Sequence, residues 1–455
     1  MINSVAIIGA GPSGCALACF LKMRGIDCVV FDNDKSPSLM VGESLVPAVI
    51  PILRRLGIEE RIAEISRIKR GAALRHGNGN RVDFAFQQFG RTFPNYSYNI
   101  PRPQFDQVLK SRAKELGVQF VDARARLDKV VVADEETLKL SAQSLLAAGL
   151  NRSSEPDLLI DATGRTRLFS KLLNISSRRG PRNDIAHFAH FKNFSADSEL
   201  DGQVVLTALR CGWSWQIPLK DVTSVGVVFN SEAAKYYGAT ADRRLDAAIE
   251  HNDVLRRAGI ERQRVSDVMT YGNYQLMSDQ AHGRGWVLLG DSLGFVDPML
   301  SPGVFMALES AVILDQLVFN NKLKNQQELN KACASYFSQM RDWHDAWSRL
   351  IAYFYDGRML SMGQMRDHIR DQSSFWSVSR YAEPIVSRVL SKLVSGVGTR
   401  SDLNHSILHY STEHLIKDKT CLQANQISSV LTKNDLDHIE LIQKFGSVDQ
   451  QCGLA

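Results

Sequence analysis

The residues with the clearest chemical potential form a glycine-rich loop near the N-terminus, made of Gly9, Ala10, Gly11, Pro12, Ser13 and Gly14. Gly9 allows a tight turn, Gly11 lets the backbone approach a pyrophosphate, and Gly14 lets the following helix pack closely on the preceding strand. Asp32 stands at the end of a second apolar run, where a carboxylate can accept hydrogen bonds from a ribose 2′-hydroxyl. Because a strand, this loop, a helix and a distal acid occur in that order, the sequence predicts a dinucleotide-binding unit.

Two later segments run from an apolar strand into an acidic turn and bear on which dinucleotide is bound. Residues 157–165 contain Asp161 and Gly164, and residues 286–291 end in Gly290 and Asp291. Each segment alone could be an ordinary turn that carries an acid. Together with the N-terminal unit they resemble the flavoprotein monooxygenase superfamily, in which the aspartate of the Gly-Asp turn binds the ribityl chain of FAD. This resemblance favours FAD over NAD.

Lys69, Trp213 and Trp215 are candidates for the chemistry itself. Lys69 lies in a basic stretch before an apolar strand, and it could be a solvated charge. Drawn into a partly dry cavity, it would instead be a strong hydrogen-bond donor whose pKa is lowered by burial. The two tryptophans are two residues apart, so both indoles lie on one face of a strand and could wall off a cavity or simply pack a sheet against its neighbour.

Four stretches of this sequence resemble the flavin-dependent halogenases, especially those that act on phenols and pyrroles. They are residues 41–47 (VGESLVP), residues 69–72 (KRGA, for K-x-G-A), residues 213–218 (WSWQIP, for W-x-W-x-I-P) and residues 295–303 (FVDPMLSPG, for F-x-x-P-x-x-S-x-G). The resemblance covers roughly the first 320 residues. It implies membership of the FAD-dependent monooxygenase superfamily.

The resemblance implies a role for each motif. Lys69 would be the catalytic lysine, Asp291 would bind the ribityl chain of FAD, and Arg102 would approach the flavin. Gly42, Glu43 and Ser44 would contact the cofactor, although Glu43 could instead cap a helix. The substrate tunnel, in which the tryptophans keep substrate away from the flavin, would be lined by Trp213, Trp215, Ile217, Pro218, Phe295 and Pro298. The halide would be held by Ser301, Pro302 and Gly303.

The implied reaction is halogenation of an electron-rich aromatic, a phenol or pyrrole that is free or tethered to a carrier protein. It uses FADH₂, O₂ and bromide or chloride, and Lys69 directs the hypohalous acid that forms. Since no second glycine fingerprint for a nicotinamide cofactor occurs, we expect a separate flavin reductase to supply FADH₂. The alternatives are a flavin monooxygenase or dehydrogenase on the same scaffold, and an FAD-binding partner protein without turnover. No metal is expected.

Two residues depart from the halogenase pattern. Pro302 has no N–H to offer a halide, so we expect weaker or altered halide binding and a preference for bromide over chloride. Leu300 stands where halogenases of free tryptophan carry an acidic residue, so free tryptophan is disfavoured as substrate.

Composition restricts the class of protein. The chain has 455 residues, of which 44% are hydrophobic, so a disordered or collagen-like chain is excluded. A formal net charge of +5 is mild and spread along the chain, and nucleic acid is not an expected partner. The seven cysteines form no C-x-x-C pair, which indicates reduced thiols and a cytoplasmic protein. No stretch approaches the ~18 apolar residues of a membrane span.

The expected fold class is α/β. We expect a Rossmann-like FAD-binding domain over residues 1–325, with a β-sheet substrate domain inserted at about residues 73–100 and 185–272. A helical C-terminal region should follow over residues 326–455. Aromatic residues at helical spacing in this region should be core residues or line the substrate pocket; they are Trp343, Trp347, Tyr353, Phe354 and Tyr355.

Overall fold

The computed structural model divides the chain into two compact units. It describes residues 2–33, 39–76, 81–87, 89, 91–194, 202–209, 211–272, 275–321, 323–361, 388–415 and 426–427. Unit 1 comprises residues 1–65, 101–180 and 275–348, and unit 2 comprises residues 66–100, 181–274 and 349–455. Each unit therefore combines segments that are far apart in the sequence.

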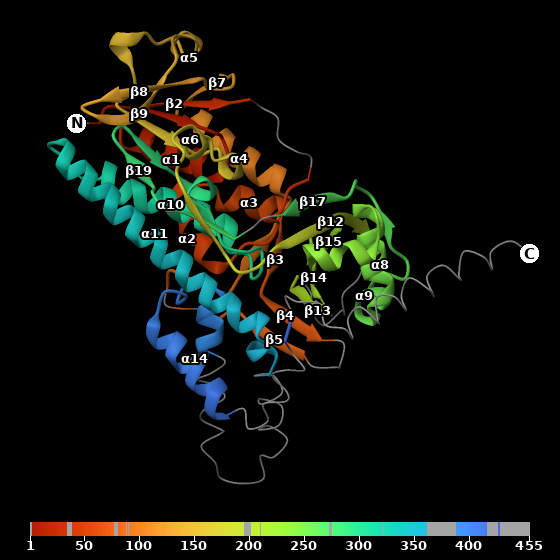
Figure 1. The fold of residues 1–455 in the computed structure, drawn as a ribbon. Helices are drawn as coiled ribbons and strands as arrows, with labels where there is room; N and C mark the ends of the chain where they lie inside the picture. The colour runs from red at the N-terminus through yellow and green to blue at the C-terminus, as the bar shows by residue number, and fades with distance from the viewer. Residues whose placement is uncertain are drawn as a thin grey trace, which may run out of the picture. The chain divides into compact units, whose positions relative to one another are not determined.

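Unit 1 is built on a six-stranded sheet with the order β19-β20-β10-β1-β2-β7. Its strands are β1 (Ser4–Ile8), β2 (Asp27–Asp32), β7 (Gln119–Asp122), β10 (Leu158–Asp161), β19 (His282–Gly283) and β20 (Trp286–Leu288). Strands β20 to β7 are parallel, and apolar runs such as those of β1 and β10 are buried, as in a parallel sheet covered by helices. The sheet confirms the predicted Rossmann-like unit (Figure 1).

Helices pack around this sheet. Those described in unit 1 are α1 (Pro12–Met23), α2 (Ile50–Leu56), α3 (Glu59–Ile65), α4 (Arg102–Glu115), α5 (Ala142–Ala147), α6 (Leu168–Leu172), α10 (Pro302–Leu314) and the larger part of α11 (Gln326–Tyr355). Helix α1 contacts both α4 and α10, and its Cys15 and Cys19 are buried free thiols. Small additional sheets are formed by β8 (Leu127–Val132) with β9 (Glu135–Leu140), and by β11 (Ser177–Arg179), β18 (Leu276–Ser278) and β21 (Gly294–Phe295).

Residues Pro302–Phe319 form an apolar helical segment whose length was not expected from the sequence. Within the described part of the chain, it is the one helix long and apolar enough to cross a membrane, with a mean hydropathy of 1.5. Yet 72% of this segment is buried inside the structure. It packs as a core helix: the ring of Phe305 meets those of Trp343 and Trp347 edge to face, at centroid distances of 4.9 and 6.4 Å.

Unit 2 is built on a larger, mostly antiparallel sheet with the order β16-β12-β15-β14-β13-β4-β5, to which β17 adds beside β12. Its strands are β4 (Gly71–His76), β5 (Arg81–Ala85), β12 (Asp184–Lys192), β13 (Val204–Leu209), β14 (Gly212–Pro218), β15 (Thr223–Asn230), β16 (Gln263–Arg264) and β17 (Met269–Gly272). A separate antiparallel pair joins β3 (Arg67–Lys69) to β6 (Ser97–Asn99). The predicted strands over residues 204–209 and 224–229 are confirmed.

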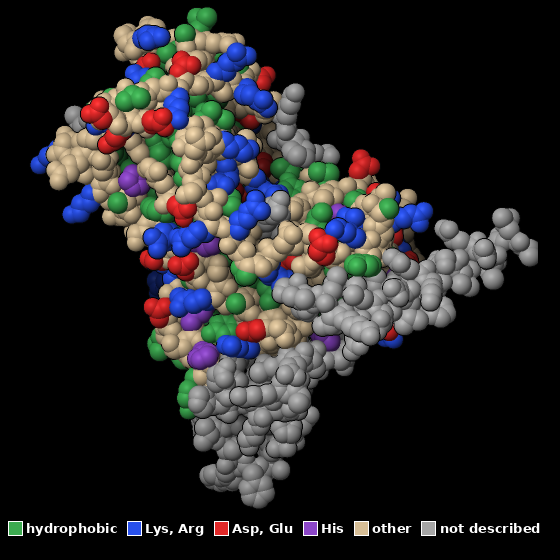
Figure 2. All heavy atoms as spheres, in the orientation of Figure 1, with side chains coloured by type: hydrophobic (Ala, Val, Ile, Leu, Met, Phe, Trp, Pro, Cys, Tyr) green, Lys and Arg blue, Asp and Glu red, His purple; other side chains and the backbone are tan. Residues whose placement is uncertain are grey.

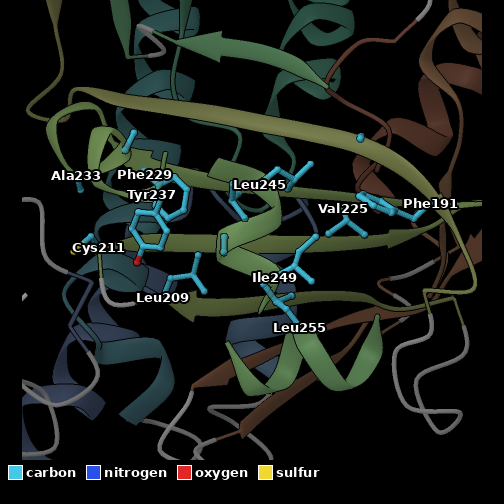
Figure 3. Close-up of a cluster of buried hydrophobic side chains, with 14 of the residues drawn as sticks. Phe191, Leu209, Cys211, Val225, Phe229, Ala233, Tyr237, Leu245, Ile249 and Leu255 are labelled. Carbon is cyan, nitrogen blue, oxygen red and sulfur yellow. The ribbon is translucent and has the colours of Figure 1, made fainter. Parts of the chain in front are cut away.

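The two faces of the large sheet carry different side chains, because successive residues of a strand point to opposite faces. One face carries Val225, Val227 and Phe229, which pack with Leu245 and Ile249 in a buried apolar cluster (Figure 3). The other face carries Trp213 and Trp215. The sheet of unit 2 thus separates an ordinary hydrophobic core from the aromatic face that the sequence singles out.

The expectation of strands throughout residues 185–272 is wrong for its middle part. Residues 231–258 form α7 (Ser231–Ala234), α8 (Ala241–His251) and α9 (Asp253–Ala258). Side chains cap these helices: Thr240 accepts from the backbone N–H of Arg243, and Asn252 accepts from those of Val254 and Leu255. Leu245, Ala248 and Ile249 recur at helical spacing and are buried, so the local pattern is that of an amphipathic helix.

The C-terminal region is described only in part. Helix α11 covers residues from Gln326 onward as predicted, and α14 spans Asp402–Leu415. The rest of the predicted helical region lies largely outside the described residues.

On the described surface in view, Lys and Arg side chains lie among Asp and Glu side chains, as the mild net charge suggests (Figure 2).

Candidate functional site

The glycine loop joins β1 to α1, and its three glycines are required for different reasons. Gly9 has φ +111°, and a Cβ there would lie 2.4 Å from the carbonyl oxygen of Ala162. A Cβ on Gly14 would lie 2.1 Å from the carbonyl oxygen of Gly9. A Cβ on Gly11, in contrast, would meet no protein atom within 4 Å. Packing within the protein therefore requires glycine at positions 9 and 14. At Gly11 no protein atom requires it, and the backbone there is open to a ligand.

Helix α1 presents an uncapped N-terminus at this loop. Gly11 is the N-cap residue, Pro12 is the first helical residue, and the first turn contains no acidic side chain. Its free N–H groups and the positive end of the helix dipole suit a pyrophosphate. Cys15 stabilises the loop, since its thiol donates to the carbonyl oxygen of Ala10 at 3.1 Å. The loop therefore fits the phosphates of a dinucleotide.

The Gly-Asp turn at residues 290–291 lies against the start of α1. Gly290 has φ +63°, and a Cβ there would lie 2.7 Å from Oγ of Ser13. The Gly290 N–H donates to Oγ of Ser310 on α10 at 3.0 Å. Burial raises the pKa of the neighbouring Asp291 to about 6, opposed by the positive charges of Arg102 and Arg165. A carboxyl group in this position can exchange hydrogen bonds with sugar hydroxyls.

Arg102 connects the loop over residues 41–44 to helix α4. Its guanidinium donates to the carbonyl oxygen of Val41 at 2.7 Å and pairs with Asp106 one turn further along the helix. Gly42 has φ +96°, and a Cβ there would lie 2.5 Å from a guanidinium nitrogen of Arg102. The predicted residues Glu43 and Ser44 follow directly and are both buried. The sequence motif over residues 41–44 is thus a loop folded onto Arg102.

Asp32 is the last residue of β2 and Asp161 is the last residue of β10, but their surroundings differ. Asp32 accepts a hydrogen bond from Nζ of Lys110 at 2.8 Å and is half-buried. Asp161 is fully buried, and both its oxygens accept hydrogen bonds within its own turn: Oδ1 from Thr163 and Oδ2 from the N–H of Phe169. Gly164 follows in the left-handed region with φ +58°. Asp161 therefore orders the turn, whereas Asp32 lies at the position expected for a ribose.

The predicted halide loop has an unusual backbone. Leu300 and Ser301 are consecutive left-handed residues with φ +63° and +62°, and α10 begins at Pro302. The Ser301 N–H donates to the carbonyl oxygen of Pro298 at 3.1 Å. A Cβ on Gly303 would lie 2.9 Å from the ring of Phe295. Of the amides that a halide could use, that of Ser301 is therefore already hydrogen-bonded to Pro298, and Pro302 has no N–H.

Lys69 is buried rather than solvated. It ends β3, its side chain is 3% exposed, and desolvation lowers its pKa from 10.5 to about 7. Its Nζ lies 5.4 Å from the ring centroid of Phe86. Across the strand pair it faces Ser97, which is also buried and whose Oγ has no hydrogen-bond partner among the described residues. Near neutral pH the Lys69 side chain therefore populates both the charged ammonium and the neutral amine.

Trp213 and Trp215 lie side by side on β14, with ring centroids 5.7 Å apart. Both are buried. The Trp215 indole N–H donates to Oγ of Ser224 at 3.2 Å, and its ring meets that of Phe188 at 5.6 Å. The Trp213 indole N–H donates to the hydroxyl of Tyr355 at 2.9 Å. Both indoles are thus fixed in the sheet face that they share with half-buried Ile217.

Asn99 connects the strand pair of Lys69 to the end of β14. Its side-chain amide donates to the carbonyl oxygens of Pro218 at 3.2 Å and Gly202 at 3.0 Å. Asn99 lies on β6, two residues from Ser97, and is fully buried. Within unit 2 the Lys69 strand and the tryptophan strand are therefore joined through one amide.

The predicted site residues divide between the units. The cofactor and halide sets lie in unit 1, together with Phe295 and Pro298, whereas Lys69 and the W-x-W-x-I-P residues lie in unit 2. Among the described residues, no cluster of three or more His, Cys, Asp and Glu side chains could hold a metal ion.

Sequence reasoning missed Ser97, Asn99 and Lys110, which contact or flank these positions. It predicts Tyr355 as a core or pocket aromatic, but not its contact with Trp213. The other three carry no motif, and a cross-strand or helix-to-strand contact is needed to find them.

Comparison with known proteins agrees with this geometry. Residues 87–393, more than half of the chain, match the tryptophan halogenase family, and residues 7–45 match an NAD(P)-binding Rossmann-like domain. The chain belongs to the tryptophan halogenase family. Its members are flavin-dependent oxidoreductases, so the predicted enzyme class and flavin cofactor are confirmed at the level of the family.

Curated relatives of this halogenase-family chain differ in substrate. The 1H-pyrrole-2-carbonyl-[peptidyl-carrier protein] chlorinase of Pseudomonas fluorescens is 26% identical over 80% of this chain and 86% of its own length. The tryptophan 2-halogenase of Chondromyces crocatus is 25% identical over 89% of this chain and 77% of its own length. The sequence identities to these two relatives are nearly equal, so they do not decide between carrier-bound pyrrole and tryptophan as the type of substrate.

Solved structures share the fold. The flavin-dependent brominase Bmp2 superposes with a TM-score of 0.70 at 20% identity, covering 91% of this chain and all of that chain. A flavoprotein/dehydrogenase from Cytophaga hutchinsonii also has a TM-score of 0.70 at 20% identity, covering 98% of this chain and 99% of that one. The scaffold of the halogenase family is therefore shared with proteins described by other activities.

Proposed function

We propose that this protein is an FADH₂-dependent halogenase of an electron-rich aromatic ring, in which Lys69 directs the halogenating oxidant. The overall reaction consumes the aromatic, halide, O₂, FADH₂ and one proton, and yields the halogenated aromatic, FAD and two water molecules. The single observation that carries the proposal is the buried amine of Lys69, which stands in a stretch that resembles a halogenase motif and whose pKa is lowered by burial to about 7.

FAD, when bound and reduced, supplies two electrons to the reduction of O₂. Gly11 and the N-terminus of α1 would hold its pyrophosphate, and Asp32, oriented by Lys110, would hold its ribose. Asp291 would bind the ribityl hydroxyls, with Arg102 nearby. The open backbone at Gly11 supports this assignment, because no protein atom accounts for a glycine there.

Lys69 would hold hypohalous acid by a hydrogen bond and orient its halogen toward the aromatic carbon. A hydrogen-bonded and polarised oxidant is more electrophilic than a free one, and burial keeps water from competing for the same donor. The indoles of Trp213 and Trp215 would wall the site so that substrate does not approach the flavin. Residues Ile217 and Pro218, with Phe295 and Pro298, are proposed as further lining.

The halide would bind at the start of α10, where Ser301, Pro302 and Gly303 stand. The Gly303 amide is the proposed donor, because Pro302 has no N–H and the Ser301 N–H donates to Pro298. Fewer donors penalise chloride more than bromide, since chloride is the more strongly hydrated ion and needs more compensation on leaving water. We therefore propose bromide as the preferred halide.

The proposed substrate is a phenol or a pyrrole, free or bound to a carrier protein. Relatives named for carrier-bound pyrrole support the tethered form. A separate flavin reductase is proposed as the source of FADH₂, and the cytoplasm as the site of action.

A second candidate is a flavin monooxygenase or dehydrogenase on the same scaffold. The observation that favours it is the halide loop, in which one amide is missing at Pro302 and another is engaged at Ser301. Mass spectrometry separates the two functions. The purified protein would be given chemically reduced FAD, O₂ and either bromide or chloride, with free and carrier-tethered phenols and pyrroles and with tryptophan. Halogenated product supports the proposal, whereas hydroxylated or dehydrogenated product from the same panel supports the second candidate.

A further inference from the structure

The indole of Trp213 is held by a residue that is 142 positions away in the sequence. Its N–H donates to the hydroxyl of Tyr355 at 2.9 Å, and both side chains are buried. Tyr355 is the last residue of α11. The contact therefore joins the end of a long helix to the tryptophan strand, within unit 2.

Tyr355 is itself contacted by the charged side chain of Arg182. The guanidinium carbon of Arg182 lies 3.8 Å from the ring centroid of Tyr355, a cation–π contact. Arg182 also donates to Asp184, at 2.6 Å from Nε to Oδ2 and at 3.3 Å from the second nitrogen to Oδ1. The side chains of this ion pair are 8% and 1% exposed. Arg182 is thus fixed over the ring by a buried partner.

This arrangement selects one orientation of the Trp213 ring. An indole has one N–H, so turning the ring over on its Cβ–Cγ bond would move the donor away from Tyr355. The buried N–H would then lose its partner, which is unfavourable. Trp215 is different, because its N–H finds Ser224 on the adjacent strand β15 of the same sheet. Only Trp213 of this pair depends on a distant element.

We propose that Tyr355, supported by Arg182 and Asp184, is a positioning residue that fixes the plane of the Trp213 indole and so maintains the wall around the halogenation site. The inference rests on the proposed function, in which Trp213 separates substrate from the flavin. Loosening this ring opens that separation, so that FADH₂ is oxidised without halogenation of the aromatic. The quantity that Tyr355 controls is therefore the yield of halogenated product for each FADH₂ oxidised.

The first test asks whether the hydrogen bond governs the ring. Tyr355→Phe removes the hydroxyl but keeps the ring and its contact with Arg182. The chain has six tryptophans, and the indole N–H signal of Trp213 is assigned in ¹⁵N-resolved NMR by its loss in Trp213→Phe. In Tyr355→Phe we expect that signal to move upfield and to exchange with water at least about tenfold faster. Tyr353→Phe, the same change on the half-buried neighbour two residues away, should leave it in place.

The second test asks whether the ring governs coupling. In Tyr355→Phe we expect the yield per FADH₂ oxidised to fall about 2- to 10-fold, the range of one neutral hydrogen bond, while the rate of FADH₂ oxidation stays unchanged. In a Trp213→Phe background, which has no indole N–H, Tyr355→Phe should lower the yield no further.

Distinct results overturn distinct claims. An unmoved Trp213 signal in Tyr355→Phe would refute the positioning role directly. A moved signal with an unchanged yield would also refute it, while leaving the halogenase proposal intact. Absence of halogenated product from the wild-type protein would instead refute the proposed function, and with it the role of Tyr355 in coupling.

Discussion

The glycine loop over residues 9–14 takes its form from one βαβ unit, whereas the surroundings of Lys69 and Trp213 come from separate segments. Gly9 and Gly14 are explained by atoms of the loop and of the adjacent strand turn. Lys69 faces Ser97 across a strand pair, and Trp213 bonds to Tyr355 at the end of a helix. The proposed nucleotide site is therefore specified by local sequence, whereas the proposed halogenation site depends on tertiary contacts.

The comparison predicts opposite outcomes for two glycine substitutions in the same loop. Gly11→Val should abolish FAD binding yet leave the fold intact, because its side chain fills only space that the protein leaves open. Gly14→Ala should instead destabilise the fold, because its Cβ would lie 2.1 Å from a backbone oxygen. Titration of FAD by flavin fluorescence and thermal unfolding of the apoprotein measure the two effects. Unchanged FAD affinity in Gly11→Val would remove this loop from the cofactor site.

The burial of Lys69 predicts a pH-dependent gain in stability for Lys69→Met. Below pH 7 the amine is protonated in both states, and the folded state carries the full desolvation penalty. Between pH 7 and 10.5 the folded amine is neutral while the unfolded one stays protonated, so the wild type becomes more stable as pH rises.

The free energy of unfolding of Lys69→Met should therefore exceed that of the wild type by at most roughly 5 kcal/mol below pH 7, and this advantage should shrink toward pH 10.5. Denaturant unfolding at several pH values measures it, with Lys192→Met as the exposed control. A gain that does not vary with pH would contradict the lowered pKa of Lys69.

A smaller effect is expected at the halide loop. Pro302→Ser restores an N–H at the start of α10, and one hydrogen bond to an ion changes affinity about tenfold or more. We expect the wild type to saturate at lower bromide than chloride, and the variant to narrow this difference, in assays of turnover against halide concentration. Equal saturation by the two halides in the wild type would refute the argument from the missing amide.

Sequence reasoning succeeded where a signal was local. The glycine loop, the Gly-Asp turn and the strands over residues 204–209 and 224–229 follow from spacing and alternation. It failed over residues 231–258, where caps at Thr240 and Asn252 favour helices. It also could not find Ser97 or Lys110, or single out Tyr355 among the helix aromatics, because nothing in their local sequence records which distant side chain each one meets.

Halogenation by Lys69→Met tests the central claim most directly. With reduced FAD, O₂, bromide and an accepted substrate, the variant should oxidise FADH₂ at the wild-type rate and bind FAD with unchanged affinity. Its halogenated product, measured by mass spectrometry, should fall at least about 100-fold, while Lys192→Met keeps the wild-type yield. Product from Lys69→Met within twofold of the wild type would contradict the account, because the buried amine would then play no part in directing the oxidant.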